Sequence, residues 1–239
     1  MSTVMRLALV GSSVLAVQLA ACEATERDGA TDDPARQILD GARRALGAPE
    51  SPTLLQVMAD ASVEGPGASF RTRIHSSSDG RVRMEQTPQG FVAGVGRGGA
   101  WRVEPATGRL DTLGPDLAFV RGHELHMLAL APRSRLTAPR FLGSTRVDGD
   151  VVLAVSMSMA GGDSLVAWFG RADTLPLGFR VMWTDPPVDV RWFGWSDRGG
   201  VRIFENAIFR QGTEEFRYTF DTIRLGPIPD SMFEPGPDN

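Results

Sequence analysis

The chain lacks or is poor in several residues on which common kinds of protein chemistry depend. It has no lysine, so all 25 basic residues are arginine, which excludes Schiff-base catalysis and the lysine of a phosphate-binding loop. Its only cysteine is Cys22, so no disulfide can form within one chain. It has three histidines and a formal net charge of −4. Because nothing in this balance provides a basic surface, we expect no nucleic-acid partner.

The first residues have the layout of a secretory signal. Arg6 precedes an apolar stretch over 7–21 that is too short, and too often interrupted by polar residues, to span a membrane. The stretch ends in Leu19-Ala20-Ala21-Cys22 and so resembles the lipobox of bacterial lipoproteins, whose cysteine is lipidated and becomes the first residue. We therefore expect a signal peptide over 1–21, lipidation of Cys22 and attachment to a membrane of the bacterial cell envelope, facing the periplasm. Glu23, in place of an aspartate, favours the outer membrane over the inner one.

The rest of the chain divides by composition into a tether, one domain and a short tail. Residues 22–33 are small, acidic and polar, which is typical of a flexible tether. Residues 34–235 are about as many as one domain with one core requires. Residues 236–239 form the tail. Two helices are expected in the domain, one over 34–46 with Asp33 as N-cap and Gly47 after its end, and a second, inserted helix over 115–131.

The remainder of the domain predicts strands joined by short turns. Alternating apolar and polar residues recur between glycine-containing turns such as Asp148-Gly149, a pattern typical of antiparallel hairpins. The expected strands cover 55–64, 70–75, 81–87, 90–95, 100–104, 109–113, 141–147, 151–159, 164–169, 178–183, 188–195, 201–210 and 215–225. Proline excludes the segment after Leu225 from the centre of a sheet.

The order of these elements, and three short motifs, resemble the LolA/LolB-like lipoprotein-carrier superfamily. The motifs are an aromatic strand with its turn over 100–108, an Asp-x-x-Thr-x-Leu-Pro-like turn over 170–177 and the proline-flanked phenylalanine after Ile228. This resemblance implies an α+β fold: an antiparallel, strongly curved and unclosed β-barrel (a half-barrel) with an N-terminal helix and an inserted lid helix. It also implies a hydrophobic cavity that holds acyl chains, without catalysis and without a cofactor.

Several segments carry more apolar residues than one buried sheet face requires. The segment 165–169 is apolar on both faces, and much of 192–195 is too, so a second cover is expected, which could be a helix, a partner or a ligand. Methionines that alternate with serines over 156–159 would adapt to a flexible guest. The residues expected to line the cavity are Phe91, Trp101, Phe119, Leu125, Leu128, Met157, Met159, Trp168, Phe169, Trp183, Trp192 and Trp195.

Three alternatives stay open. The same sheet could serve as a non-catalytic envelope scaffold that binds a protein partner and no ligand. Ser164, in a Gly-Asp-Ser-Leu segment, could be the nucleophile of a hydrolase, although no histidine follows His126 to act as its base. His123 and His126 could share a metal ion, but two ligands are too few, so no metal site is expected.

Overall fold

Thirteen strands pair into one antiparallel sheet in the computed structural model, which describes residues 33–49, 54–112, 116–159 and 162–236. Their order across the sheet is β6-β5-β4-β3-β2-β1-β13-β12-β11-β10-β9-β8-β7. The sheet is therefore unclosed, with β6 and β7 at its edges, and the predicted half-barrel is confirmed. The strand bounds are β1 Gln56–Gly65, β2 Ala68–Ser77, β3 Val82–Thr87, β4 Phe91–Gly96, β5 Gly99–Val103, β6 Leu110–Asp111, β7 Leu136–Val147, β8 Asp150–Met159, β9 Ser164–Gly170, β10 Pro176–Val181, β11 Val188–Arg198, β12 Val201–Gln211 and β13 Glu214–Leu225.

Helix α1, Pro34–Ala45, is capped at both ends by side-chain or backbone hydrogen bonds. The Asp33 side chain accepts a hydrogen bond from the backbone N–H of Ala35 at 3.0 Å, and Pro34 occupies the first turn. At the other end Gly47 has a φ of +65°, a conformation that glycine adopts readily. The backbone N–H of Ala48 returns to the carbonyl of Arg43 at 3.0 Å, as in a Schellman cap. These caps leave the apolar side of α1 to pack against the sheet.

The inserted segment forms two short helices, which corrects the prediction of one helix over 115–131. Helix α2 covers Asp116–Gly122, and helix α3 covers Leu125–Leu130. Between them the backbone N–H of His123 bonds to the carbonyl three residues earlier, at Val120, so the helix tightens and ends. Glu124 then turns its carboxylate toward Arg135, at 2.5 Å, instead of continuing the helix. A short 3₁₀ helix, η1 (Pro132–Ser134), leads into β7, which begins five residues before the expected strand.

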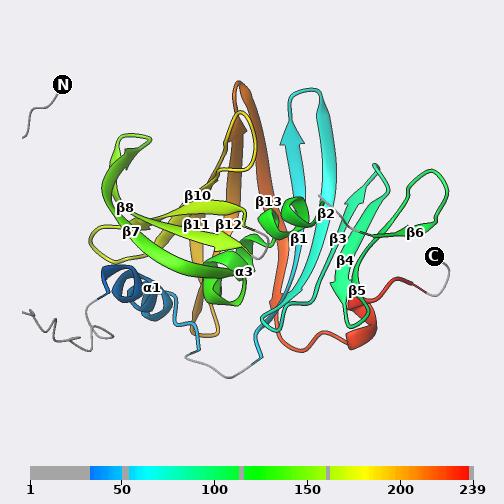
Figure 1. Cartoon of the computed structure of the whole chain (residues 1–239), viewed down its shortest axis with the longest axis horizontal. Helices are drawn as coiled ribbons and strands as arrows, with labels where there is room; N and C mark the ends of the chain where they lie inside the picture. The colour runs from blue at the N-terminus through cyan, green and yellow to red at the C-terminus, as the bar shows by residue number, and fades with distance from the viewer. Residues whose placement is uncertain (1–32, 50–53, 113–115, 160–161, 237–239) are drawn as a thin grey trace, which may run out of the picture. The chain divides into compact units, whose positions relative to one another are not determined.

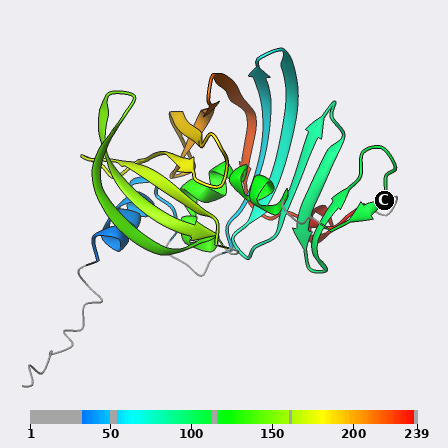
Figure 2. The same ribbon diagram turned by 45° about the horizontal axis from the view of Figure 1, so that its top comes forward.

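The two faces of the sheet differ in what covers them. We call the face that carries α2 and α3 the concave face, and the opposite one the outer face. Figures 1 and 2 show α2 and α3 lying in the hollow of the curved sheet. The curvature follows from irregular pairing, with register shifts in β1, β7 and β10, because a bulge bends its strand and increases its twist. Helix α1 packs near β7.

The core on the concave face is filled mainly by α3. All six of its residues are buried, and they pack with α1 and with inward side chains of β1 and β8–β13 in one cluster. A smaller cluster lies between α2 and strands β2–β4, around Val120 and Met84. The predicted lid segment therefore consists of a buried plug, α3, and a more exposed helix, α2, whose Phe119 is 42% exposed. Beside α2 the concave face leaves room for a guest.

The outer face of β3–β5 is covered by the end of the described chain. The 3₁₀ helix η2, Asp230–Phe233, contacts β3 and β4. Phe233 is completely buried, and its carbonyl accepts a hydrogen bond from the indole nitrogen of Trp101 at 3.1 Å. The guanidinium of Arg81 lies 4.8 Å from the centre of the Phe233 ring. Helix η2 thus forms a strap over this face.

Some predictions fall on residues outside the described ranges. These are the signal peptide 1–21, the tether 22–33 apart from Asp33, the lipidation of Cys22, and the last three residues of the tail 236–239. Among the described residues, no helix combines the length and apolar character needed to cross a membrane.

Candidate binding cavity

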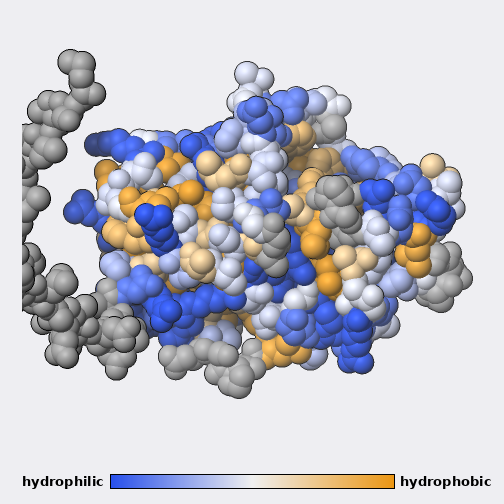
Figure 3. All heavy atoms as spheres, viewed as in Figure 1, coloured by the Kyte–Doolittle hydropathy of each residue, from blue (hydrophilic) through white to orange (hydrophobic). Residues whose placement is uncertain are grey.

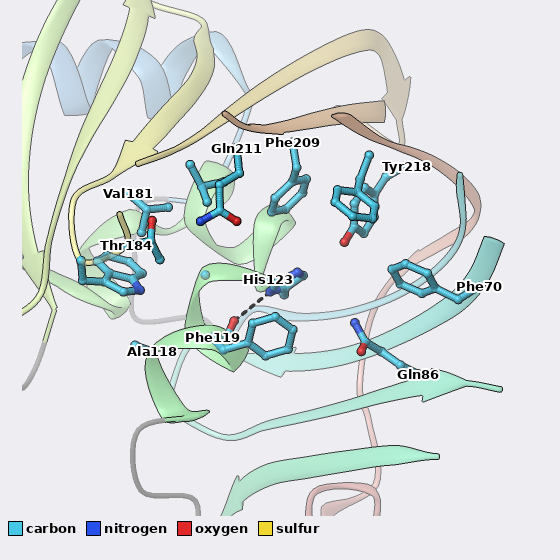
Figure 4. Close-up of a pocket in the computed structure, with 14 residues that line it drawn as sticks. Phe70, Gln86, Ala118, Phe119, His123, Val181, Thr184, Phe209, Gln211 and Tyr218 are labelled. Atoms are coloured by element: carbon cyan, nitrogen blue, oxygen red, sulfur yellow. Dashed lines mark hydrogen bonds between the residues drawn. The ribbon is translucent and has the colours of Figure 1, made fainter. Parts of the chain in front are cut away.

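A cavity of about 340 Å³ opens on the concave face beside α2. Strands β2 and β3 contribute to one wall and β10, β12 and β13 to others, while α2 lies along it. Figure 4 shows the labelled side chains converging on one space. The volume lies at the lower end of the roughly 300–1,000 Å³ that small-molecule sites occupy. The lining residues are Phe70, Gln86, Ala118, Phe119, Gly122, His123, Val181, Trp183, Thr184, Val188, Phe209, Gln211, Phe216 and Tyr218.

The aromatic wall of this cavity follows from strand register. Phe209 of β12 pairs with Phe216 of β13, and Val63 of β1 pairs with both Tyr218 and Phe70. Side chains at paired positions lie on the same face of a sheet, so these rings are brought together on the concave face. The centres of the Phe209 and Tyr218 rings are 4.6 Å apart. Apolar side chains also reach the surface on the side shown in Figure 3, between hydrophilic areas.

His123 lies among these rings at the end of α2. Its ring is stacked on Phe209, with centres 5.1 Å apart and planes at 17°, and it lies 4.3 Å from the ring of Phe119. Its Nδ1 is 2.8 Å from the Phe119 carbonyl oxygen. Burial lowers the pKa of His123 to about 4, and the bond to the Phe119 carbonyl opposes this shift only in part. His123 is therefore neutral at pH 7.

The polar groups of the cavity are all uncharged at neutral pH. Burial raises the pKa of Tyr218 above its ordinary value, so its phenol keeps its proton. Gln211 donates a hydrogen bond to the carbonyl of Pro186 at 3.0 Å, and Gln86 lies on the opposite wall. The Thr184 hydroxyl oxygen is buried and has no hydrogen-bond partner among the described residues. No arginine, aspartate or glutamate is among the residues that line the cavity.

The residues predicted to line a cavity divide among several places. Phe119 and Trp183 line the open cavity, and Phe91 packs edge-to-face on Phe119 at 5.7 Å. Trp195 packs against Phe204 at 5.4 Å, in the main core. The other six on the concave face are buried around α3, where the remaining space is only about 10 Å³ and could hold at most one water molecule. These six are Leu125, Leu128, Met157, Met159, Phe169 and Trp192.

Two of the predicted residues lie on the outer face instead, which corrects their assignment to the cavity. Trp101 pairs with Gly94, one position away from the inward-facing Ala93, so its ring points to the side covered by η2. Trp168 pairs with Ala154 in a small outer cluster. The guanidinium of Arg191 lies 5.8 Å from the Trp168 ring. The expected second cover of this strand is thus arginine and neighbouring strand residues, and no ligand is required there.

The prediction from sequence missed most of the aromatic wall. Phe216, Tyr218 and Phe220 alternate along the last strand, and a run of aromatic residues at every second position identifies one continuous face. The sequence therefore indicates that these three side chains share one face. It does not show which residues of β2 and β12 lie beside them, because cross-strand register depends on pairing between distant segments.

The alternative chemistries find little support in the geometry. Ser164 begins β9, and none of the hydrogen bonds among the described residues joins it to a histidine. His126 is stacked on Phe204 at 4.2 Å, and its Nε2 lies 3.1 Å from the Phe204 carbonyl oxygen, so it turns away from His123. Within the described ranges, no group of three histidine, cysteine or acidic side chains is placed to bind a metal ion.

A larger depression of about 800 Å³ lies between α1 and η1. Its lining is mixed and includes Arg43, Arg44 and Arg133. Arg133 is already paired with Asp40 at 3.2 Å. Because sites for apolar guests are lined mainly by apolar and aromatic groups, the smaller cavity beside α2 is the better candidate.

Comparison with solved structures places this fold among known ones. A LolA superfamily protein from Nitrosomonas europaea matches with a TM-score of 0.57 and 12% identity, over 84% of this chain and 97% of that one. A domain assigned to the outer membrane lipoprotein-sorting proteins of Vibrio parahaemolyticus matches with a TM-score of 0.52 and 10% identity, over 83% and 97%. A DUF1329 family protein from Desulfovibrio piger matches with a TM-score of 0.53 and 13% identity, over 84% and 98%. No protein-family model and no curated protein sequence matches the chain. The fold is therefore LolA-like, as predicted.

Proposed function

We propose that this chain, which has a LolA-like fold, is a non-catalytic lipoprotein of the bacterial envelope that binds a lipid or a lipoprotein acyl chain in the cavity beside α2. It would act as a carrier, acceptor or sensor, by taking up and releasing its guest without a covalent step. The observation that carries this proposal is an open, aromatic-lined cavity of about 340 Å³ in a molecule whose remaining concave face is filled. The solved structures of similar fold include a lipoprotein-sorting domain, which supports the same function.

The physical basis of binding would be burial of apolar surface. Each square ångström of apolar area removed from water contributes about 25 cal/mol, while ordering a flexible chain opposes binding. The cavity is too small for a lipid with several chains to enter completely, since it lies at the lower limit for ligand sites. We therefore propose that one chain or one ring system enters at a time.

Filling the cavity from Gly122 tests the proposal. A Cβ atom at Gly122 would meet only the Trp183 ring, at 3.7 Å, which is ordinary contact. Gly122→Leu should therefore occupy the cavity without backbone strain and lower the affinity for a fluorescent fatty acid at least tenfold. Gly122→Ala is the matched control, because it adds a methyl group and improves helix propensity. Leu142→Ser, at a half-exposed position on β7, controls for loss of surface apolar area.

The same chain can be examined for a guest acquired in the cell. Native mass spectrometry of the chain from Glu23 onward, which carries no lipid of its own, should detect a bound acyl-chain mass that is absent from Gly122→Leu. Equal affinity of the wild type, Gly122→Ala and Gly122→Leu would contradict binding in this cavity. It would favour the second candidate, an envelope scaffold without a ligand.

Attachment to the envelope is a separate part of the proposal. We propose removal of a signal peptide over 1–21, acylation of Cys22, a tether over 22–33 and location at the outer membrane in preference to the inner one. More than one acyl chain would give a durable anchor, because each buried methylene contributes about 0.8 kcal/mol. Metabolic labelling with a fatty acid should mark the wild type and leave Cys22→Ser unmarked. Labelling of both would refute lipidation at this cysteine.

A further inference from the structure

Two polar groups deep in the cavity have no hydrogen-bond partner among the described residues. One is the hydroxyl of Tyr218, a side chain that is 4% exposed, and the other is Nε2 of His123, which is 9% exposed. Figure 4 shows both rings beside the same space, between Phe70 and Phe209. Both atoms are accessible from the cavity, so water can bond to them while it is empty. A purely apolar guest that displaced this water would leave them unsatisfied, which is unfavourable. These two groups therefore favour a guest that itself carries a polar atom.

The hydrogen-bonding state of His123 determines what kind of atom can meet it. The Phe119 carbonyl can only accept a hydrogen bond, so the neutral ring must carry its hydrogen on Nδ1. Nε2 is then an acceptor and needs a donor. The Tyr218 hydroxyl can donate or accept. A single oxygen that donates to His123 and accepts from Tyr218 would satisfy both, and a hydroxyl group has this capacity.

The charge of the cavity restricts the guest further. The lining provides no arginine and no acidic side chain, so an ionised head group inside would be buried without a counter-charge, which is strongly unfavourable. A carboxylate also has no hydrogen to donate to Nε2. The Thr184 hydroxyl also lines the cavity, on the opposite wall. It is buried, uncharged and without a hydrogen-bond partner among the described residues.

We propose that the guest is an uncharged lipid bearing a hydroxyl group, which enters hydroxyl-first so that its oxygen bridges His123 Nε2 and the Tyr218 hydroxyl. Its hydrocarbon part packs against the aromatic rings of Phe209, Phe216 and Phe119. This proposal rests on the proposed function and gives the substrate class of the same cavity. It distinguishes a hydroxyl lipid from an acyl chain that enters methyl-first with an ionised head group left in water.

Three ligands of equal chain length test this selectivity. Binding of 1-decanol, decyl methyl ether and decanoate to the chain from Glu23 onward is measured by titration calorimetry at neutral pH. The alcohol can donate and accept, the ether can only accept, and the carboxylate is charged. We expect the alcohol to bind about three- to tenfold more tightly than the ether, the effect of one net hydrogen bond.

His123→Phe keeps the ring and removes the acceptor, so it should bring the alcohol and the ether to similar affinity while the ether itself binds as before. Tyr218→Phe removes the donor that both ligands can use, so it should weaken both and leave the alcohol the tighter of the two. Circular dichroism confirms that each variant is folded. If alcohol and ether bind the wild type equally, water satisfies the two groups and the hydroxyl proposal is overturned, although lipid binding stands. If none of the three ligands binds and the fluorescent fatty acid does not bind either, the proposed function fails together with it.

Discussion

At the scale of single residues, a buried ion pair follows α2 and joins it to distant parts of the chain. The Glu124 side chain is completely buried, and Arg135 approaches it to 2.5 Å with a side chain only 3% exposed. Arg121 adds a second contact at 2.6 Å, and Arg135 also donates to the Ser77 carbonyl at 2.7 Å. These bonds fasten the plug helix to the β2–β3 turn and to the start of β7. A buried charge that loses its partner is strongly destabilising, so this cluster holds the insertion in place.

Replacement of Arg135 by methionine should lower the free energy of unfolding by about 3–5 kcal/mol, because Glu124 would remain buried with incomplete compensation. Arg133→Met is the matched control two positions away. Its ion pair with Asp40 is about half exposed, and such pairs contribute about 0–1 kcal/mol. Urea denaturation followed by circular dichroism measures both. If both variants lost the same free energy of unfolding, the buried ion pair would contribute no more to stability than the exposed one.

At the scale of elements, the sequence predicted the strands well but assigned two tryptophans, Trp101 and Trp168, to the wrong face of the sheet. Every expected strand is present because alternating residues and glycine turns are local signals. The sequence did not predict the break between α2 and α3 at His123–Glu124. The break depends on the ion pair of Glu124 with Arg135 and on the stacking of His123 on Phe209, and both partners are distant along the chain. Trp101 was assigned to the cavity because an aromatic strand residue looks the same on either face. Only the strap η2, which arrives from more than a hundred residues away, determines that this face is covered.

The packing of η2 on the sheet leads to a prediction about stability. Phe233→Ala should lower the free energy of unfolding by about 3–5 kcal/mol, because it leaves a cavity between η2 and the sheet. Met232→Ala is the control, since that side chain is 37% exposed. Hydrogen exchange should show protection lost first in β3–β5 and retained in β8–β9. Uniform loss across the sheet would contradict a local role for the strap.

At the scale of the whole molecule, the two halves of the sheet join where the first strand pairs with the last. Val57 of β1 pairs with Leu225 of β13, while β2 follows β1 on its other side. The centre of the sheet therefore depends on contacts between the beginning and the end of the domain. Because α3 packs on the same core, we expect the domain to unfold as one unit.

Acid should lower the free energy of unfolding of the domain. Burial lowers the pKa values of His123 and His126 to about 4, below the unfolded value of 6.5, and it also lowers the pKa of His75. Because the unfolded chain then binds more protons, stability is complete above about pH 6.5 and falls as the pH decreases toward 4. The slope is about 1.4 kcal/mol per pH unit for each histidine, so the free energy of unfolding should be about 3 kcal/mol lower at pH 5.5 than at pH 7.5.

Urea denaturation at the two pH values checks this. His126→Phe keeps the stacking on Phe204 and removes the titrating group, so it should reduce the difference substantially. Arg198, which lowers the pKa of His126 through its charge, can be replaced by glutamine as a control with a smaller effect. A difference unchanged in His126→Phe would refute this assignment.

The unclosed sheet leaves two edges on which foreign strands could add, the usual origin of fibrils and other aggregates. One edge, β6, is only two residues long. The other, β7, has 12 residues but contains Pro139 and two breaks in register, and Ala138 has a φ of +48°. Proline and bulges interrupt the row of backbone donors that an incoming strand needs. We therefore expect that replacing Pro139 and restoring regular pairing in β7 would expose a longer continuous strand edge and promote association between copies of the chain.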